Sequence, residues 1–382
     1  MSKHAPMNVA VVGAGIMGAC IAFHLVRLGV RVHCVERGRP GGGTTDTSFA
    51  RLSAYQQPTP TGFLINTTGI AEYTHLARIL DLSPFWHPCG SMAWTRDDCD
   101  QADGRTFHDC IEQMREWGYQ VRWCDAQEVN RSLDPRIRFP TPSTPVALLP
   151  QEGWVDAPAL AEALLRRRAG LLAVQHAAEA VVCEAGRVRS LRLDDGTQLP
   201  VDAVVNAAGL GALALATTAP APVPALAQRS SLVVDLATTA PAPPWVLRAP
   251  DVQIRSAGPG RLRIRSDQVD SQLADPPVPP GPIPRALVDD LLDRARACLP
   301  DLAEAETSKV RICTGVFPHD GLPAVGEVSA VHGYYEAVTD RGVTLGPLLG
   351  RLLAEFIVTG NRPDLLAHCR PDRLRESGGK TR

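Results

Sequence analysis

The residues with the clearest chemical task lie within the first forty positions. An apolar run at 9–12 leads into a glycine-rich turn, an amphipathic stretch ends at Gly29, and a second apolar run at 30–35 ends at Glu36. The turn itself consists of Gly13, Ala14, Gly15, Ile16, Met17 and Gly18. Such a turn presents backbone N–H groups and a positive helix end to a phosphate, and an acid at this distance binds ribose hydroxyls. The succession of strand, turn, helix, strand and acid therefore predicts a dinucleotide site.

The three glycines of this turn have separate tasks. Gly13 allows the tight bend, Gly15 lets the backbone approach a pyrophosphate, and Gly18 allows the helix to pack closely. A glycine turn without a nucleotide is disfavoured, because the flanking strand, helix and acid all have the required spacing. Taken alone, the fingerprint also fits an NAD-dependent dehydrogenase, so this alternative stays open.

A loop dense in glycine and hydroxyl residues follows Glu36. It begins at Arg37 and extends to Ser48. A loop of this composition either wraps a second phosphate or a ring system, or is a plain surface loop.

A second glycine-containing loop lies near the C-terminus. Residues 334–339 are predicted to form a strand, the loop 340–347 follows, and the last helix runs to Thr359 and stops at Gly360. We expect Thr344 to cap this helix, with Pro347 in its first turn. A second positive helix end is therefore available to a ligand.

The middle of the chain alternates between two kinds of segment. Residues 85–150 are rich in Trp, Cys and charge and indicate a separate lobe, whereas the apolar run 203–209 is typical of a parallel strand whose tip touches a ligand. A helix is predicted over 69–82. A hairpin at 252–256 and 261–266 places three arginines, 261, 263 and 265, on one face, which indicates solvent more than an anion site.

Composition limits the classes of function. The chain has 382 residues and a formal net charge of −2, so two domains are expected and nothing favours nucleic acid as a partner. Residues 1–8 are too short and polar for a signal peptide, and the most apolar stretch, 342–358, carries Arg351 and Glu355. We therefore expect a cytoplasmic protein without a transmembrane segment. The ten cysteines lack metal-binding spacing, so they are interpreted as reduced thiols, and no metal site is expected.

Taken together, these motifs resemble FAD-dependent oxidoreductases of the D-amino-acid oxidase superfamily, such as glycine oxidase, sarcosine oxidase and D-amino-acid dehydrogenase. The resemblance covers the whole chain in motif order. Besides the glycine turn and the run 206–209, it is carried by the segments 36–38, 45–50, 152–156, 320–323 and 342–345.

The resemblance implies an α/β fold. A discontinuous Rossmann-like FAD-binding domain would comprise residues 1–85, 150–215 and 310–382. An inserted α+β substrate domain, residues 86–149 and 216–309, would be built on a mainly antiparallel sheet. The implied activity is oxidation of the C–N bond of an amine or amino acid (a D-amino acid, glycine or an N-alkyl amino acid) by hydride transfer to the flavin. Oxygen, a quinone or a redox protein would then accept the electrons.

The resemblance also assigns residues to the FAD. The ADP half would lie on the glycine turn and Glu36, the backbone near Ala180 would touch the adenine, and a helix dipole at residues 342–345 would stabilise the reduced flavin. The implied cofactor residues are Gly13, Ala14, Gly15, Ile16, Met17, Gly18, Glu36, Arg37, Thr44, Thr45, Ser48, Ala50, Ala180, Ala208, Gly209, Gly315, Arg341, Gly342, Val343, Thr344 and Leu345.

Two departures from the family pattern bear on the substrate. Relatives often have Arg-Pro at positions 315–316, where that arginine clamps the substrate carboxylate, and this chain has Gly-Val. Relatives also often have Thr-His-Ser-Gly at 339–342, where this chain has Thr-Asp-Arg-Gly. The loss of this arginine is therefore expected to change the substrate class or to move the anchor, and the substrate-binding candidates are Arg341 first, then Arg51, Arg311 and Asp340. A surface or cofactor-phosphate role for each arginine stays open.

Cys313 lies seven residues before Asp320. In sarcosine oxidase a cysteine at this offset holds the flavin through a thioether. A strand cysteine is usually a core residue, but neighbouring Arg311 could lower the thiol pKa and favour the link. A further alternative for the whole protein is a flavoprotein subunit that is inactive alone or belongs to a hetero-oligomeric dehydrogenase.

Overall fold

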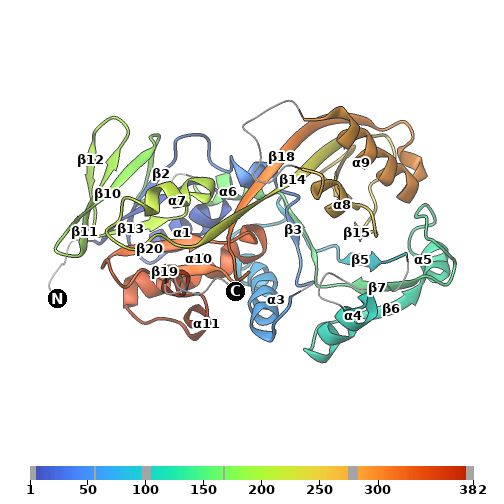
Figure 1. The fold of residues 1–382 in the computed structure, drawn as a ribbon, viewed down its shortest axis with the longest axis horizontal. Helices are drawn as coiled ribbons and strands as arrows, with labels where there is room; N and C mark the ends of the chain where they lie inside the picture. Colours follow the sequence, from blue (N-terminus) through green and yellow to red (C-terminus); the bar gives the residue numbers. More distant parts are fainter. Residues whose placement is uncertain (1–5, 56, 97–104, 167, 274–282, 376–382) are drawn as a thin grey trace.

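The computed structural model describes residues 6–55, 57–96, 105–166, 168–273 and 283–375. Two large sheets lie side by side, one in each half of the molecule (Figure 1). The α/β class and the mainly antiparallel second sheet are confirmed.

The first sheet has six strands, and four of its five pairings are parallel. Only the edge strand β19 runs antiparallel, to β20. In spatial order the strands are β19 (Ala324–Glu327), β20 (Tyr334–Val338), β13 (Ala203–Asn206), β1 (Asn8–Val12), β2 (Arg31–Val35) and β9 (Leu171–Val174).

Both faces of this sheet are covered. Val9 and Val11 pack with helices α1 (Ile16–Arg27) and α10 (Gly342–Thr359), whereas Ala10 and Val12 pack on the opposite side. The second cover is a small sheet of β10 (Ala178–Glu184), β11 (Arg187–Leu193) and β12 (Gln198–Pro200) with α7 (Ala212–Ala216). Successive side chains of a strand point to opposite faces, so the continuous apolar run at 9–12 is what a doubly covered strand needs.

The second sheet has eight strands and is antiparallel except where β15 meets β5. Its order is β18 (Glu306–Pro318), β14 (Leu226–Ala237), β17 (Arg261–Arg265), β16 (Gln253–Ser256), β15 (Val246–Arg248), β5 (Ser91–Trp94), β7 (Pro145–Leu149) and β6 (Arg122–Asp125). Helix α9 (Arg285–Cys298) packs on one face. Strand β18 belongs to this sheet, although residues 310–318 were assigned to the FAD domain.

Short elements join the two halves. A three-stranded sheet of β3 (Arg51–Leu52), β8 (Gly153–Val155) and β4 (Trp86–His87) lies between them. The remaining helices are α2 (Thr44–Thr47), α3 (Pro60–Leu76), α4 (Phe107–Glu116), α5 (Ala126–Ser132), α6 (Ala157–Leu164), α8 (Asp267–Asp270) and α11 (Asp364–Ala367), with 3-10 turns η1 (Gly209–Gly211), η2 (Pro300–Leu302) and η3 (Pro371–Leu374).

Two predicted helix boundaries are wrong. Helix α3 covers Pro60–Leu76 rather than 69–82, because the Thr59 hydroxyl accepts from the Gly62 N–H and caps an earlier start. Helix α10 begins at Gly342 with Arg341 as its N-cap residue, so Thr344 does not cap it and Pro347 lies inside the helix. The Thr344 hydroxyl is turned instead toward the Arg51 carbonyl, at 3.4 Å.

Helix α10 is a core element. It is the one helix in the described ranges that is long and apolar enough to cross a membrane by length and composition, and 72% of it is buried inside the protein. Gly350 lets it approach α1 closely, since a Cβ there would lie 2.7 Å from the Cys20 Cβ. The Arg351 guanidinium binds both carboxylate oxygens of Glu72, at 2.7 and 2.9 Å. These contacts place α10 against α1 and α3.

Candidate functional site

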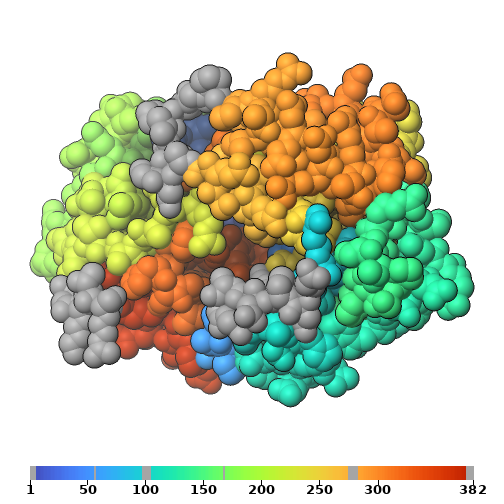
Figure 2. Space-filling view, turned by 45° about the vertical axis from the view of Figure 1, so that its right-hand side comes forward, coloured from blue at the N-terminus to red at the C-terminus, as the bar shows by residue number. Residues whose placement is uncertain are grey.

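Two adjoining cavities lie where the two halves meet, and Figure 2 shows the surface hollowed there. Their volumes are about 580 and 650 Å³. We call them the smaller and the larger cavity. Five residues line both: Thr44, Ser48, Gly315, Asp340 and Val343. The two spaces therefore form one continuous site for a long ligand and a second, smaller molecule.

The glycine turn forms one end of the smaller cavity. Gly13 has φ of 101°, and a Cβ on it would lie 2.4 Å from the Ala207 carbonyl oxygen. A Cβ on Gly18 would lie 1.8 Å from the Gly13 oxygen. Gly15 is different, because its φ is −67° and its Cβ would meet only the Thr45 hydroxyl, at 3.0 Å. Gly13 and Gly18 are thus required by the backbone itself, whereas a side chain on Gly15 would press only on the Thr45 side chain among the described residues.

The N-terminus of α1 is open to this cavity. Gly15 is its N-cap residue and provides no side-chain cap, while the Ile16 N–H donates to the buried Thr45 hydroxyl at 3.0 Å. The Glu36 carboxylate accepts from the N–H groups of Ala14 at 2.9 Å and Gly38 at 2.8 Å. A carboxylate with two oxygens retains lone pairs for further donors. The helix end and the fixed acid are the partners that a pyrophosphate and a ribose require.

The loop around α2 is held at three points by the eight-stranded sheet, to which Thr314 also belongs. The Thr44 hydroxyl donates to the Thr314 carbonyl at 2.7 Å. From the eight-stranded sheet, Arg263 donates to the Ser48 carbonyl at 2.7 Å, and the buried Arg255 donates to the Phe49 carbonyl. The loop that separates the two cavities is therefore positioned by long-range contacts and is not a plain surface loop.

The N-terminus of helix α10 also lies at the two cavities. Residues at the start of α10 line both cavities, and no side chain caps this helix end. The Arg341 guanidinium contacts Gln57, whose amide oxygen, turned toward it, accepts from Nη1 at 2.8 Å and Nη2 at 3.0 Å. Burial lowers the pKa of Arg341. The result is a guanidinium held in place by a neutral partner.

Most of the assigned cofactor residues line one of the cavities. The exceptions are Ala14 and Gly18 within the turn, Leu345, and Ala180. Leu345 is a fully buried residue of α10. Ala180 lies in β10, where it pairs with Arg192, and it lines neither cavity.

The substrate-binding candidates separate into two groups. Arg51, Arg341 and Asp340 line the larger cavity. Arg311 does not, because its buried guanidinium is paired with Asp235. Asp235 also accepts from Arg263 at 2.7 and 3.0 Å, so it compensates two arginines.

The eight-stranded sheet contributes a part of the site that was not predicted from the sequence. Arg248, Gln253 and Arg265 lie side by side across β15, β16 and β17 and line the larger cavity. The arginine face of the hairpin was predicted to be solvated, but the side chains of Arg263 and Arg265 are only 11% and 21% exposed. The signal in the sequence was the pair Asp267 and Asp270, which both bind Arg265.

Cys313 lines the larger cavity from β18. Burial raises the pKa of its thiol, and a hydrogen bond from Thr47 does not offset this. The expectation that Arg311 lowers this pKa is wrong, because that guanidinium is turned to Asp235. The thioether stays a prediction.

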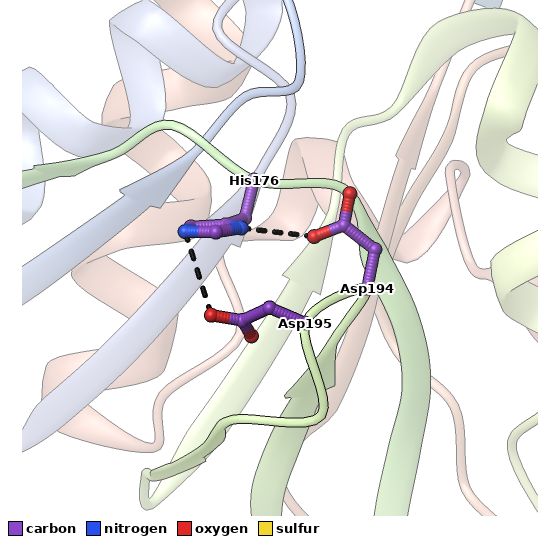
Figure 3. A group of neighbouring side chains, drawn as sticks. All are labelled: His176, Asp194 and Asp195. Atoms are coloured by element: carbon purple, nitrogen blue, oxygen red, sulfur yellow. Dashed lines mark hydrogen bonds and ion pairs between the residues drawn. The ribbon is translucent and has the colours of Figure 1, made fainter.

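A separate cluster lies outside both cavities. His176 contacts Asp194 at 2.9 Å and Asp195 at 3.6 Å (Figure 3), and these three groups are close enough to share a metal ion. All three side chains are at least 40% exposed. The Thr197 N–H donates to Asp195, so the two aspartates belong to the turn that follows β11, whereas His176 lies just before β10.

Comparison with known proteins establishes the class. The family of FAD dependent oxidoreductases matches residues 8–356, and the chain belongs to this family. It is 25% identical over 377 residues to glycine oxidase of Geobacillus kaustophilus, covering 92% of each protein. It is also 25% identical to 4-methylaminobutanoate oxidase of Paenarthrobacter nicotinovorans, covering 94% of this chain and 45% of that protein.

Solved structures support the same fold. The crystal structure of the Geobacillus kaustophilus glycine oxidase superposes with a TM-score of 0.80 at 22% identity, covering 96% of this chain and 99% of that one. Iminodiacetate oxidase from Chelativorans has a TM-score of 0.77 at 21% identity, covering 95% and 98%.

The protein is thus an FAD-dependent oxidoreductase, and the interpretation of the glycine turn as an NAD-dependent dehydrogenase is wrong. The uncapped helix ends and the glycine-lined space fit this cofactor. When bound, FAD supplies the hydride acceptor, while the chain orients and desolvates the substrate.

Proposed function

We propose that the protein oxidises the C–N bond of an amine that also carries a carboxylate, such as an amino acid or an N-alkyl amino acid. One observation carries this proposal. The guanidinium groups of Arg51 and Arg341 line the cavity that adjoins the dinucleotide cavity, and each is held by an amide, Gln253 or Gln57. Within the described residues, neither has a carboxylate at ion-pair distance. Arg51 would act beside Arg341 in binding the substrate.

The electrostatics favour an anionic ligand. Removal from bulk water, together with the nearby Arg248, lowers the pKa of Arg51 to about 9, so the group stays charged at neutral pH. A buried charge without a counter-ion is costly, and a carboxylate that binds it gains a charge-assisted hydrogen bond worth about 1.5–3 kcal/mol. Both named relatives support this, because glycine and 4-methylaminobutanoate each combine an amine with a carboxylate.

Arg341 also takes the place of an arginine that the larger cavity lacks at position 315. Gly315 stands where relatives often have the carboxylate-binding arginine, and a Cβ on it would meet no atom of the described residues within 4 Å. Arg341, held by Gln57, brings a guanidinium to the same cavity from another element. The anchor has moved from strand β18 to the start of α10.

The chemistry balances without a further co-reactant in the reductive half. Bound FAD would supply the acceptor for a hydride from the carbon next to the neutral amine, whose nitrogen lone pair would form the C=N bond, and the resulting iminium would be hydrolysed in water. The acceptor that reoxidises the cofactor is oxygen, a quinone or a redox protein. Peroxide formation in air identifies an oxidase.

The test is an anaerobic panel followed by the visible flavin band. Amino acids and N-methyl amino acids are compared with matched amines that lack the carboxylate. We expect bleaching by carboxylate-bearing amines and little by their decarboxylated counterparts. Equal bleaching by both sets would refute the role of the arginines, and no bleaching by any amine would point to a subunit that is inactive alone.

A further inference from the structure

Strand β18 separates the two cavities, and each of its faces lines one of them. Ile312 and Thr314 line the smaller cavity, whereas Cys313 and Phe317 line the larger one. This alternation is expected, because successive side chains of a strand point to opposite faces. Of residues 312–317, Gly315 alone lines both cavities. The strand is therefore open between the two cavities at the position that lacks a side chain.

The surrounding protein does not require a glycine at position 315. Its φ lies outside the positive range that favours glycine, and a Cβ on it would meet no atom of the described residues within 4 Å. A glycine inside a strand destabilises it relative to other residues, and it often marks the close approach of a ligand. Gly13 and Gly18 differ, because a Cβ on either would overlap backbone atoms. The space beside Gly315 is therefore available to a bound molecule.

The side chains around this space are mainly apolar. Cys313 and Phe317 are the neighbours of Gly315 on the same face of β18, and the exposed Arg229 of β14 lies directly opposite it. The Arg229 guanidinium lies over the Phe317 ring, 5.1 Å from its centroid. Ser231, opposite Cys313, adds one hydroxyl. A thiol, an aromatic ring and the methylene groups of an arginine thus favour an apolar group of the ligand.

This space is also distant from Arg51 along the sheet. Arg51 is held by Gln253 of β16 at 2.9 Å, and the order β16, β17, β14, β18 places three strand spacings between Gln253 and the strand of Gly315. At about 4.8 Å for each spacing, this separation is roughly 14 Å. In glycine a single carbon separates the amine from the carboxylate. A substrate as short as glycine would therefore leave the space beside Gly315 unfilled.

We propose that Gly315 is a specificity-determining residue, and that the substrate is an amino acid with an apolar substituent larger than methyl on its nitrogen or its α-carbon. The carboxylate binds the arginines, while the substituent occupies the space beside Gly315 and packs against Phe317. Glycine and sarcosine are then poor substrates. This inference rests on the proposed function and narrows its substrate class.

The first experiment measures binding without turnover. The FAD-loaded protein is titrated with acetate, butyrate and hexanoate, which lack an amine, and binding is followed by the change in the flavin spectrum. Burial of one methylene group strengthens binding about fourfold, so butyrate should bind about 15-fold more tightly than acetate, and hexanoate more tightly again. Equal affinities of the three acids, or binding of none, would overturn the proposal.

Substitutions at position 315 locate the space. Gly315→Val adds a β-branched side chain that suits a strand, so the variant should be at least as stable in urea, but its affinities for acetate and hexanoate should become nearly equal. Gly315→Ala should retain part of the difference. The control is Thr307→Val, which changes an exposed position of β18 that lines neither cavity and should preserve the full difference.

Two results with these variants would overturn the proposal. An unchanged preference for the longer acids in Gly315→Val would show that the alkyl chain binds elsewhere. Loss of bound flavin in either Gly315 variant would show that the cofactor itself fills this space.

Turnover separates this inference from the proposed function. Sarcosine is compared with N-propylglycine, and each enantiomer of alanine with the same enantiomer of norvaline, under anaerobic conditions. The larger member of at least one pair should bleach the flavin about 15-fold faster at subsaturating concentration, and that pair shows whether nitrogen or the α-carbon carries the substituent. If both members of every pair bleach it equally fast, the oxidation stands and the inference fails. If the longer acids bind more tightly but no amine bleaches the flavin, the space beside Gly315 stands and the oxidation is refuted.

Discussion

The contact between α3 and α10 gives a hydrogen-bond donor to a carbonyl that Pro347 leaves without one. Pro347 lacks an N–H, so the Val343 carbonyl, four residues earlier in α10, has no donor within its own helix. The Tyr73 hydroxyl from α3 donates to this carbonyl at 2.6 Å, and Tyr73 is fully buried. Tyr73→Phe keeps the ring and removes the donor, which leaves a buried acceptor unsatisfied.

The expected loss of unfolding free energy is about 1–3 kcal/mol, the cost of a buried acceptor left without its partner. Tyr119 provides a matched control. It is 4% exposed, and its hydroxyl has no hydrogen-bond partner among the described residues. Tyr119→Phe should therefore be neutral or slightly stabilising.

Urea unfolding of both variants, with and without added FAD, is the assay. Because Val343 lines both cavities, Tyr73→Phe should also weaken FAD binding, whereas Tyr119→Phe should not. Identical unfolding midpoints and FAD affinities for the two variants would refute the assigned role of the hydroxyl.

Four further predictions follow from the site. Gly15→Val should fold, since φ is −67°, but purify colourless because its side chain enters the cofactor space; full flavin content would contradict this. Arg341→Ala should raise KM with an unchanged flavin spectrum, and unaltered kinetics would refute the anchor. Acid denaturation tests whether Cys313 holds the flavin. With a thioether the yellow colour stays on the denatured protein, and Cys313→Ser abolishes this retention. Complete release of the flavin from the unmodified protein excludes the thioether. Burial raises the pKa of Asp235, but the ion pairs with Arg263 and Arg311 outweigh it and lower that pKa. The ionised Asp235 therefore stabilises the fold fully at pH values above its unfolded pKa of about 3.9, and this stabilisation is lost as the pH falls through its lowered folded pKa. Asp235→Asn should remove this contribution to the acid dependence of urea unfolding.

Signals confined to a few neighbouring residues were readable from the sequence. The glycine turn needs a positive φ at Gly13, and Gly360 ends α10 with φ of 72°. Each depends on local backbone geometry, which residue type reports directly. The parallel strands were predictable for the same reason, because continuous apolar runs indicate burial on both faces.

The substrate side of the site depends on long-range pairing and was not predictable. Arg51 meets Gln253 across 202 positions, and the parallel contact of β15 with β5 joins distant segments. No local pattern distinguishes an arginine that faces solvent from one covered by a loop, as Arg263 is by Ser48. Thr344 was misassigned as a helix cap because its hydroxyl faces the Arg51 carbonyl of another element.

The central claim is that FAD in this site takes a hydride from the carbon next to the amine of a carboxylate-bearing substrate. Anaerobic rapid mixing of the yellow protein with the best substrate of the panel measures this directly when the same compound carries deuterium at that carbon. Bleaching should be slowed several-fold by deuterium, because the C–H bond breaks in that step. Failure of every carboxylate-bearing amine to bleach the flavin, with bleaching by a reduced nicotinamide instead, would contradict it.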